Sequence, residues 1–511
     1  MIRPVIRIVR SELLAAAAAA ILLAAPAPAA AHVGSPDVFL EGDAGPYHLF
    51  VTVRVPQVIP GVAAIEVRTS SDDIREIRTT VTRLTGAGSK YAPVPDLARR
   101  SAQDPRFFTS GLWLMEFGSL EVRLIVDGAR GRAEMAVPVA SFAQQAFKMP
   151  RWLGAMLLVL VAGLAVGIIS IVGAAAREAV LDPGVAPTPQ YRRRGARAMA
   201  IAAAVAVAVF ALSYTWWSVD AASYQDIVNF FKPPRLSVRL EGNRLILKPA
   251  QIEVRRHFDM MEVIPDHNHL MHLFVIRMPA MDRVWHLHPD RMPNDDWVLT
   301  LPSMSAGHYA LFADIVHKSG FPITMVGAID LPEITGQPLS GDDAGGAIAP
   351  LGSLNSDTFV LPDGGKIVWQ REAQPLRAKV PAALRFAVQE QSGRPVADLQ
   401  PYMGMAAHAA IVRSDLAVFA HVHPASTVPM ASLMLVSDTS AATAGSLPSC
   451  PTSIPGALAA AEKIAPEISI PYGFPRSGQY RIIVELKRHG QIETAAFDTT
   501  VSDAPPLSAS P

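Results

Sequence analysis

Five histidines lie within 26 residues of this chain, in the segment PDHNHLMHLFVIRMPAMDRVWHLHPD, and they are His267, His269, His272, His286 and His288. The whole chain of 511 residues has 14. A neutral imidazole is a good ligand for zinc, copper, nickel and iron. A group this dense indicates either a metal site or polar residues on a wet surface.

A weak internal repeat brings the same residue types back later in the chain. Residues 267–291 align with 403–426, MGMAAHAAIVRSDLAVFAHVHPAS. His272, His286 and His288 match His408, His421 and His423, and His267 and His269 match Met403 and Met405. Thioether sulfur selects Cu(I), so the exchange of two histidines for two methionines favours copper over zinc.

Each copy predicts a β-hairpin with its histidines at one end. In the first copy PAMD forms the turn and brings His272 opposite residues 287–289; in the second copy SDL forms the turn and brings His408 opposite residues 421–422. Side chains two apart on a strand share a face, as in both H-x-H pairs. We expect a site in each copy, open to solvent for ion exchange. His317, which ends the strand YALFADIVH, is a further candidate ligand.

The first residues have the pattern of a secretory signal. Three arginines precede an apolar stretch, residues 13–25, and Ala29 and Ala31 form an A-x-A cleavage site. Cleavage after Ala31 makes His32 the first residue of the mature chain. Its α-amino group and imidazole, with His48 as a second histidine, could hold copper in a histidine brace.

Two further apolar runs, residues 152–174 and 198–217, carry no charge and are long enough to cross a bilayer. The loop between the two runs carries five arginines: Arg177, Arg192, Arg193, Arg194 and Arg197. Positive charge of this kind stays in the cytoplasm. The signal and the arginines together place the rest of the chain outside the cytoplasmic (inner) membrane, in the periplasm or the extracellular space.

Most of the remaining sequence consists of short β-prone stretches between turn residues. The predicted fold is mainly β, with three immunoglobulin-like β-sandwich domains outside the membrane plus a two-helix transmembrane hairpin. The predicted segments are a signal peptide (1–31), an exported sandwich (32–150), a first transmembrane helix (151–175), an arginine-rich cytoplasmic loop (176–196), a second transmembrane helix (197–217), a first sandwich module with the histidine cluster (232–335), a linker (336–365) and a second module with the His/Met cluster and a mobile inserted loop near 427–467 (366–503).

Two resemblances add to this reading. AHVGSP followed by a β-sandwich resembles the start of exported copper-binding sandwiches of the CopC and YcnI types, whose mature chains begin with histidine. That resemblance implies copper binding at His32 and does not extend to His48. YMGMAAHAAIVRSDLAVFAHVHP resembles exported domains found beside heavy-metal-handling proteins, a resemblance that implies no defined activity.

The expected function is a membrane-anchored metal-binding protein that buffers, senses or delivers copper, with zinc as the second choice. Its partners would be the lipid bilayer and a periplasmic metal transporter or metalloenzyme acceptor. Zero net charge and the lack of a glycine-rich phosphate loop exclude nucleic acid and nucleotide. The sequence contains no H-E-x-x-H motif and no nucleophile elbow, so we expect no enzyme activity. The alternative is an exported scaffold or protein-interaction protein, without metal, whose histidines lie on its surface.

Overall fold

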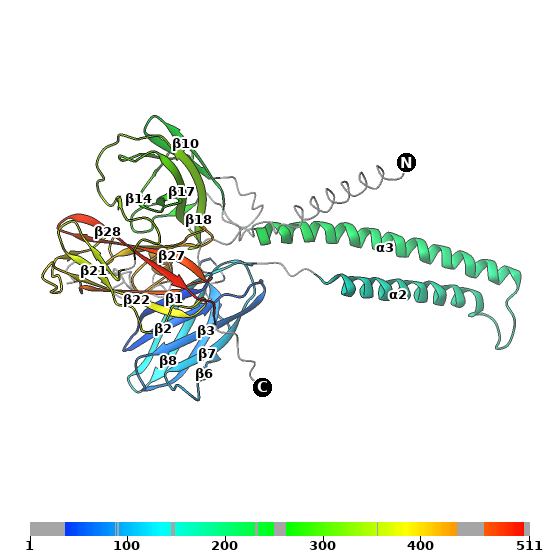
Figure 1. Ribbon diagram of the computed structural model, residues 1–511. Coiled ribbons are helices and arrows are strands. Elements are labelled where there is room, and N and C mark those ends of the chain that lie inside the picture. The colour runs from blue at the N-terminus through cyan, green and yellow to red at the C-terminus, as the bar shows by residue number, and fades with distance from the viewer. Residues whose placement is uncertain are drawn as a thin grey trace, which may run out of the picture.

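The computed structural model describes residues 36–86, 88, 91–144, 149–229, 234–249, 262–354, 356–436 and 464–504. The expected signal peptide and His32 lie outside these ranges. Among the described residues the fold is mainly β, with six antiparallel sheets that form β-sandwich domains and a helical hairpin in the middle of the chain (Figure 1).

The first sandwich precedes the hairpin. One of its sheets has the order β1 (Val38–Ala44), β2 (Tyr47–Arg54), β3 (Gly61–Thr69), β7 (Phe107–Leu114), β6 (Arg99–Arg100). The other has the order β5 (Asp96–Leu97), β4 (Ile74–Arg83), β8 (Gly118–Gly128), β9 (Gly131–Ser141). Side chains alternate along β3, where Ala63, Ile65 and Val67 are buried and their neighbours are more exposed. This period of two allows each sheet to bury one face.

The two helices, α2 (Arg151–Glu178) and α3 (Pro189–Asn229), lie side by side and project away from the β domains (Figure 1). They are longer than the predicted spans. Residues Arg151–Glu178 and Pro189–Ala222 are long and apolar enough to cross a membrane, and their most apolar windows are not buried against the rest of the protein. The helices approach closely at Gly173, where a Cβ would lie 2.6 Å from Sδ of Met199.

The first module, residues 234–347, follows the hairpin. Its smaller sheet has the order β10 (Leu236–Glu241), β11 (Arg244–Pro249), β16 (Trp297–Thr300), β15 (Asp290–Arg291). Its larger sheet has the order β12 (Val263–Ile264), β17 (Gly307–His317), β13 (His272–Met278), β14 (Arg283–Leu287), β19 (Ala344–Ala347), and β18 (Pro322–Leu331) also pairs with β17.

The second module, residues 358–501, has the same plan. Its smaller sheet has the order β20 (Thr358–Val360), β21 (Lys366–Trp369), β22 (Pro381–Gln389), β26 (Glu467–Gly473). Its larger sheet has the order β23 (Leu399–Gln400), β27 (Gly478–Arg488), β24 (His408–Arg413), β25 (Phe419–Val422), and β28 (Gln491–Val501) also pairs with β27.

The larger sheets of the two modules pack face to face. On β13, Leu273 and Val275 belong to the first module's own core, whereas Phe274 and Ile276 join a cluster that includes side chains of both modules. Phe312 of β17 stacks on Phe419 of β25, with ring centroids 4.2 Å apart and planes at 2°. Strands buried on both faces read as continuous apolar runs, which is the pattern of β13 and β24.

The hairpins of the two modules have the same register. Leu273 pairs with Leu287, and Ala409 pairs with Val422. One step further, His272 faces His288 and His408 faces His423. The prediction that His408 lies opposite residues 421–422 was therefore wrong by one residue. The second turn is one residue shorter, but the strands on either side of it pair in the same way as in the first hairpin.

The first sandwich docks onto the second module. The backbone N–H of Glu41 donates to Ala425 O at 2.7 Å, and that of Thr427 donates to Phe39 O at 3.0 Å. Val428 and Leu433 then enter the core of the first sandwich. Residues 427–436, predicted as the start of a mobile inserted loop, are thus packed between domains. Residues 437–463 lie outside the described ranges.

Candidate metal centre

The histidines lie on the faces of the two larger sheets that meet each other. On β13, His272 lies two residues from Phe274 and therefore points to the same face of the sheet. On β14, His286 shares a face with Val284 in the same way. His408 and His421 continue the inter-module faces of β24 and β25 in the same way. The packing that joins the modules therefore also collects the histidines of both hairpins at one end of the interface.

Six of these histidines form two groups. The first triad is His267, His408 and His423, and the second triad is His272, His286 and His421. Within each triad, one nitrogen from each ring lies within 4.8 Å of the others, so each triad could hold a metal ion. Both triads contain residues of both modules. The expectation of a separate site in each copy was wrong.

Burial determines the protonation of these rings. His272, His286, His408 and His423 are at most 2% exposed. Burial first, and the neighbouring histidines second, hold their pKa values well below the usual value near 6.5. Burial also lowers the pKa of His267. The rings are neutral, which is the form that binds metal. The expectation of open, solvent-facing sites was wrong for these residues, because both sheet faces are covered.

Two carboxylates cross the module boundary to meet the second triad. Nδ1 of His286 lies 2.8 Å from Oε2 of Glu485, and Nδ1 of His421 lies 3.5 Å from Oδ2 of Asp314. The acids occupy equivalent places, since Asp314 pairs with His272 in one sheet and Glu485 pairs with His408 in the other. Each module thus supplies an acid to a histidine of the other.

Sequence reasoning missed both acids, although the repeat contained a signal for them. The repeat continues downstream of the histidines, and there an alignment of Gly307 with Gly478 also places Asp314 on Glu485. Each is a carboxylate with apolar residues on both sides, in ALFADIV or in IIVEL. A charged residue at the same buried position of two copies requires a partner.

The first triad has several buried nitrogens without a hydrogen-bond partner. Among the described residues these are Nε2 of His267 and both ring nitrogens of His408, whereas the ring of His423 lies within reach of the backbone of Val428. Nδ1 of His267 donates to the carbonyl oxygen of Met403 at 2.7 Å, which leaves the Nε2 lone pair free. An unpaired buried polar group costs about 1–3 kcal/mol, and a metal ion would remove that cost for the one nitrogen that each ring offers it.

The second triad contains a hydrogen-bonded chain. Nδ1 of His272 lies 3.0 Å from Nε2 of His286, and Nε2 of His272 lies 3.0 Å from Asp266 O. One proton arrangement satisfies all three contacts: His272 donates to Asp266 O, His286 donates to His272, and a protonated Glu485 donates to His286. Burial raises the pKa of Glu485 to about 8, in agreement with that arrangement.

His269 and His288 form an outer pair beside the triads. Their rings stack with centroids 3.8 Å apart. Nδ1 of His288 is 2.9 Å from Asp343, and Nε2 of His269 is 3.2 Å from Asp342. His269 is about a quarter exposed, so this pair lies nearer to solvent.

The remaining predicted ligands lie elsewhere. His317 is buried at the end of β17 and belongs to neither triad. Met405 packs into the core of the first sandwich, and Met403 packs beside Tyr402 and Ala344.

His48 is on the first sandwich, and its ring nitrogens contact Asp43 at 2.7 Å and Glu41 at 3.2 Å. Burial lowers its pKa, but the hydrogen bonds that its ring makes to the two carboxylates outweigh burial and raise the pKa overall. Both ring nitrogens already have partners in this structure, whereas a copper brace would require one of them.

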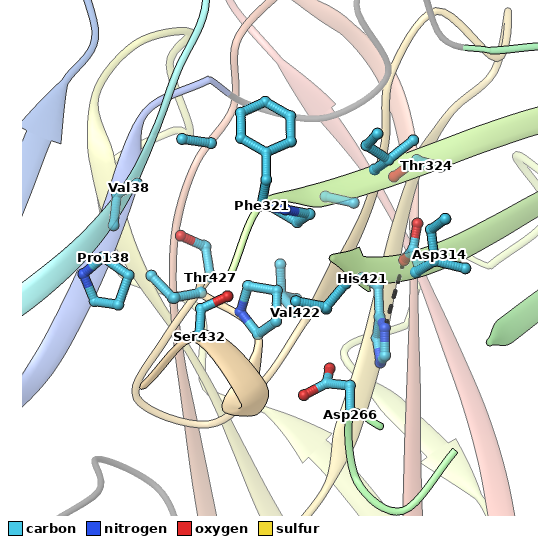
Figure 2. Close-up of a pocket in the computed structure, with 18 of the residues that line it drawn as sticks. Val38, Pro138, Asp266, Asp314, Phe321, Thr324, His421, Val422, Thr427 and Ser432 are labelled. Atoms are coloured by element: carbon cyan, nitrogen blue, oxygen red, sulfur yellow. Dashed lines mark ion pairs between the residues drawn. The ribbon is translucent and has the colours of Figure 1, made fainter. Parts of the chain in front are cut away.

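A cavity of about 180 Å³ lies where the first sandwich and both modules meet (Figure 2). His272 and His421 of the second triad and His423 of the first border it. Figure 2 shows Val38 and Pro138 of the first sandwich on one side, and the ion pair of His421 with Asp314 on the other. The cavity therefore reaches both triads.

Comparisons with known proteins describe part of the chain. Residues 360–503 match a family described as a domain of unknown function (DUF8832). No curated protein sequence matches the chain significantly.

Among solved structures, the chain is similar to the D1–D4 ectodomain fragment of ICAM-5, at 8% identity over 89% of this chain and 77% of that chain with a TM-score of 0.14. It is also similar to Salmonella alpha-2-macroglobulin, at 8% identity over 92% of this chain and 24% of that chain with a TM-score of 0.18. A third is the chicken interferon gamma receptor alpha chain, at 9% identity over 55% and 96% with a TM-score of 0.15. Scores this low assign neither a family nor a function.

Proposed function

We propose that this chain is a membrane-anchored metal-binding protein and that copper is its preferred ion. The observation that carries the proposal is the convergence of six histidines, from two modules, on two triads. Buried polar groups normally have partners. In the first triad, Nε2 of His267 and both ring nitrogens of His408 have none among the described residues, and a metal ion would partner one nitrogen of each ring.

The donor set supports copper before zinc. For a given nitrogen site, affinity among first-row divalent ions is highest for Cu²⁺. Three histidines with an open fourth position also suit zinc, which therefore remains the second choice. The methionines that favoured Cu(I) pack into hydrophobic clusters, so the preference now depends on the histidines and on the copper-protein resemblance at His32.

The burial of the centre favours retention over rapid exchange. An ion in either triad would connect strands of both modules, and it would therefore stabilise the contact between them. This suits copper buffering or sensing. Delivery to a metal transporter or a metalloenzyme would require the cavity or a movement of the modules to release the ion.

The helical hairpin supports anchoring in the cytoplasmic membrane. The most apolar window of each helix is exposed, and Arg192, Arg193 and Arg194 lie in α3 close to the turn between the helices. The positive-inside rule places that turn in the cytoplasm. Both ends of the hairpin then lead to β domains on the opposite side, where they pack together.

The test is a metal titration of the full chain in detergent. Cu(I), Cu(II) and Zn(II) are added separately to the wild type and to the double variant His408→Gln/His421→Gln, which removes one histidine from each triad. The variant His308→Gln is the control, because the His308 side chain is exposed and pairs with Asp330, outside both triads. Circular dichroism verifies that each protein is folded.

We expect the wild type and the control to bind copper more tightly than zinc, and the double variant to lose that binding. If the wild type binds no metal, or if the folded double variant binds equally well, the proposal is wrong. The protein would then be an exported scaffold whose buried histidines are structural.

A further inference from the structure

We infer that the two triads hold two copper ions as one coupled pair, and that the adjoining cavity admits a small anion that contacts both ions. This inference rests on the proposed function and adds to it the number of ions, their relationship and the class of a second ligand.

The triads are direct neighbours. Ring centroids of His421 and His423 lie 4.6 Å apart, and these residues belong to different triads. Three further contacts cross between the triads: His408 to His421 at 5.5 Å, His267 to His272 at 6.0 Å and His286 to His408 at 6.3 Å. Rings of one triad therefore touch rings of the other.

The local structure explains this closeness. His421 lies on β25 and His423 follows directly after its end, so the H-x-H pair contributes one ring to each triad. The two rings share the face of the strand that meets the first module. An ion bound to His421 and an ion bound to His423 would consequently lie on the same side of one short strand segment.

The cavity gives one ligand access to both ions. A triad of protein nitrogens leaves an open position on a four-coordinate ion. The cavity is bordered by His423 on the first triad and by His272 and His421 on the second. Its volume of about 180 Å³ exceeds that of several water molecules, at about 30 Å³ each.

The chemistry of the site favours an anion with few atoms. Two Cu(II) ions bring four positive charges that the imidazole ligands do not compensate, and the neighbouring carboxylates of Asp314 and Glu485 offset only two of them. Asp314 borders the cavity, and its Oδ1 is buried without a hydrogen-bond partner among the described residues. It can accept a hydrogen bond from a protonated ligand, such as hydroxide, that lies between the ions.

The experiment uses the full chain loaded with Cu(II), with azide as the probe. Native mass spectrometry counts the ions, and electron paramagnetic resonance shows whether their spins couple. Four variants accompany the wild type. His421→Gln affects the second triad, His423→Gln affects the first, and His489→Gln changes an exposed control histidine. Leu270→Phe adds volume to the cavity wall and replaces no proposed ligand.

We expect two ions per chain with a spin-coupled spectrum in the wild type and in His489→Gln. Each triad variant should retain one ion with the spectrum of an isolated Cu(II). Azide should produce one new charge-transfer band at one equivalent per pair, and Leu270→Phe should weaken azide binding by about tenfold or more at an unchanged copper count.

One ion per chain, two uncoupled ions, or azide binding that Leu270→Phe leaves unchanged would each overturn this inference. The first two results would leave the proposed function intact. Absence of copper binding in the earlier titration would remove both.

Discussion

Nδ1 of His286 lies 2.8 Å from Oε2 of Glu485, and 199 residues separate the two in the chain. Both side chains are at most 1% exposed. The contact joins β14 of the first module to β27 of the second. It completes a chain of hydrogen bonds from Glu485 through His286 and His272 to the backbone of Asp266.

That chain predicts that metal binding releases a proton. An ion at the second triad needs the lone pairs of both His286 and His272, so the proton between the rings must leave. This site loses one proton when Glu485 ionises and its carboxylate accepts a hydrogen bond from the Nδ1–H of His286. Because the pKa of Glu485 is about 8, affinity should rise by up to about tenfold per pH unit below pH 8 and then level off. Isothermal titration in buffers of different ionisation enthalpy measures the released proton.

Glu485→Gln provides the matched comparison, since the amide accepts from His286 without titrating. In this variant the rise of affinity toward pH 8 should disappear. An unchanged pH profile would show that Glu485 is not the group that releases the proton.

The stability of the metal-free protein should fall in acid. The pKa values of His272, His286, His408 and His423 are lowered by burial. Below about pH 6.5 the unfolded chain therefore binds protons that the folded chain does not. Each such group removes up to about 1.4 kcal/mol of unfolding free energy per pH unit, from pH 6.5 down toward its folded pKa. Urea unfolding with a chelator present measures this slope, which should be shallower in His408→Gln. A slope of zero between pH 6.5 and pH 5 would contradict the burial of neutral rings.

Asp314→Asn should weaken metal binding at the second triad. Asp314 lies beside Nδ1 of His421, and loss of a carboxylate that orients a ligating histidine typically costs about 10–100-fold in metal affinity. Asp330→Asn is the control, because Asp330 pairs with the exposed His308 on the same sheet. Competition with a chromophoric chelator compares the affinities. Equal affinities in the two variants would mean that Asp314 does not orient His421.

Phe419→Ala should destabilise the contact between the modules. Its ring stacks on Phe312 and is fully buried, so its truncation should cost about 3–5 kcal/mol of unfolding free energy. Val360→Ala, at an exposed position of the second module, should change that free energy by less than about 0.5 kcal/mol. Denaturant unfolding compares the two, and the Phe419→Ala protein should also bind metal more weakly because the triads span the same interface. Equal stability would argue against face-to-face packing.

Membrane topology can be tested because the chain has one cysteine, Cys450. In a Cys450→Ser background, single cysteines replace Val94 in the first sandwich, Val185 in the hairpin turn and Val360 in the second module, all exposed positions. An impermeant maleimide added to spheroplasts should label the replacements of Val94 and Val360, and should label that of Val185 only after permeabilisation. Labelling of all three without permeabilisation would exclude a membrane-spanning hairpin.

Much of the fold could be predicted from local patterns. Alternation along segments such as 61–69 indicates a strand with one buried face, and the prediction of a mainly β chain with sandwich domains and a two-helix hairpin is confirmed. The repeat correctly matched His272 with His408, since both begin equivalent strands.

The sharing of the centre between modules could not be predicted in the same way. Register and turn length act within a hairpin, whereas the approach of two sheets depends on side chains far apart in the chain. One clue was present: residues 273–276 and 409–412 are apolar without alternation, which is typical of strands covered on both faces. That clue predicts burial and does not identify the partner. Met403 and Met405 were assigned as ligands by alignment alone, but their side chains complete hydrophobic clusters.

The division of each triad between the modules has a consequence for the origin of the protein. A single module contains neither triad, so an ancestor with one copy could have built this centre only as a homodimer. Gene duplication and fusion would make the encounter intramolecular and independent of protein concentration. After fusion, the two copies would no longer need to be identical to fit each other. Position 267 could then keep a histidine while position 403 carries a methionine.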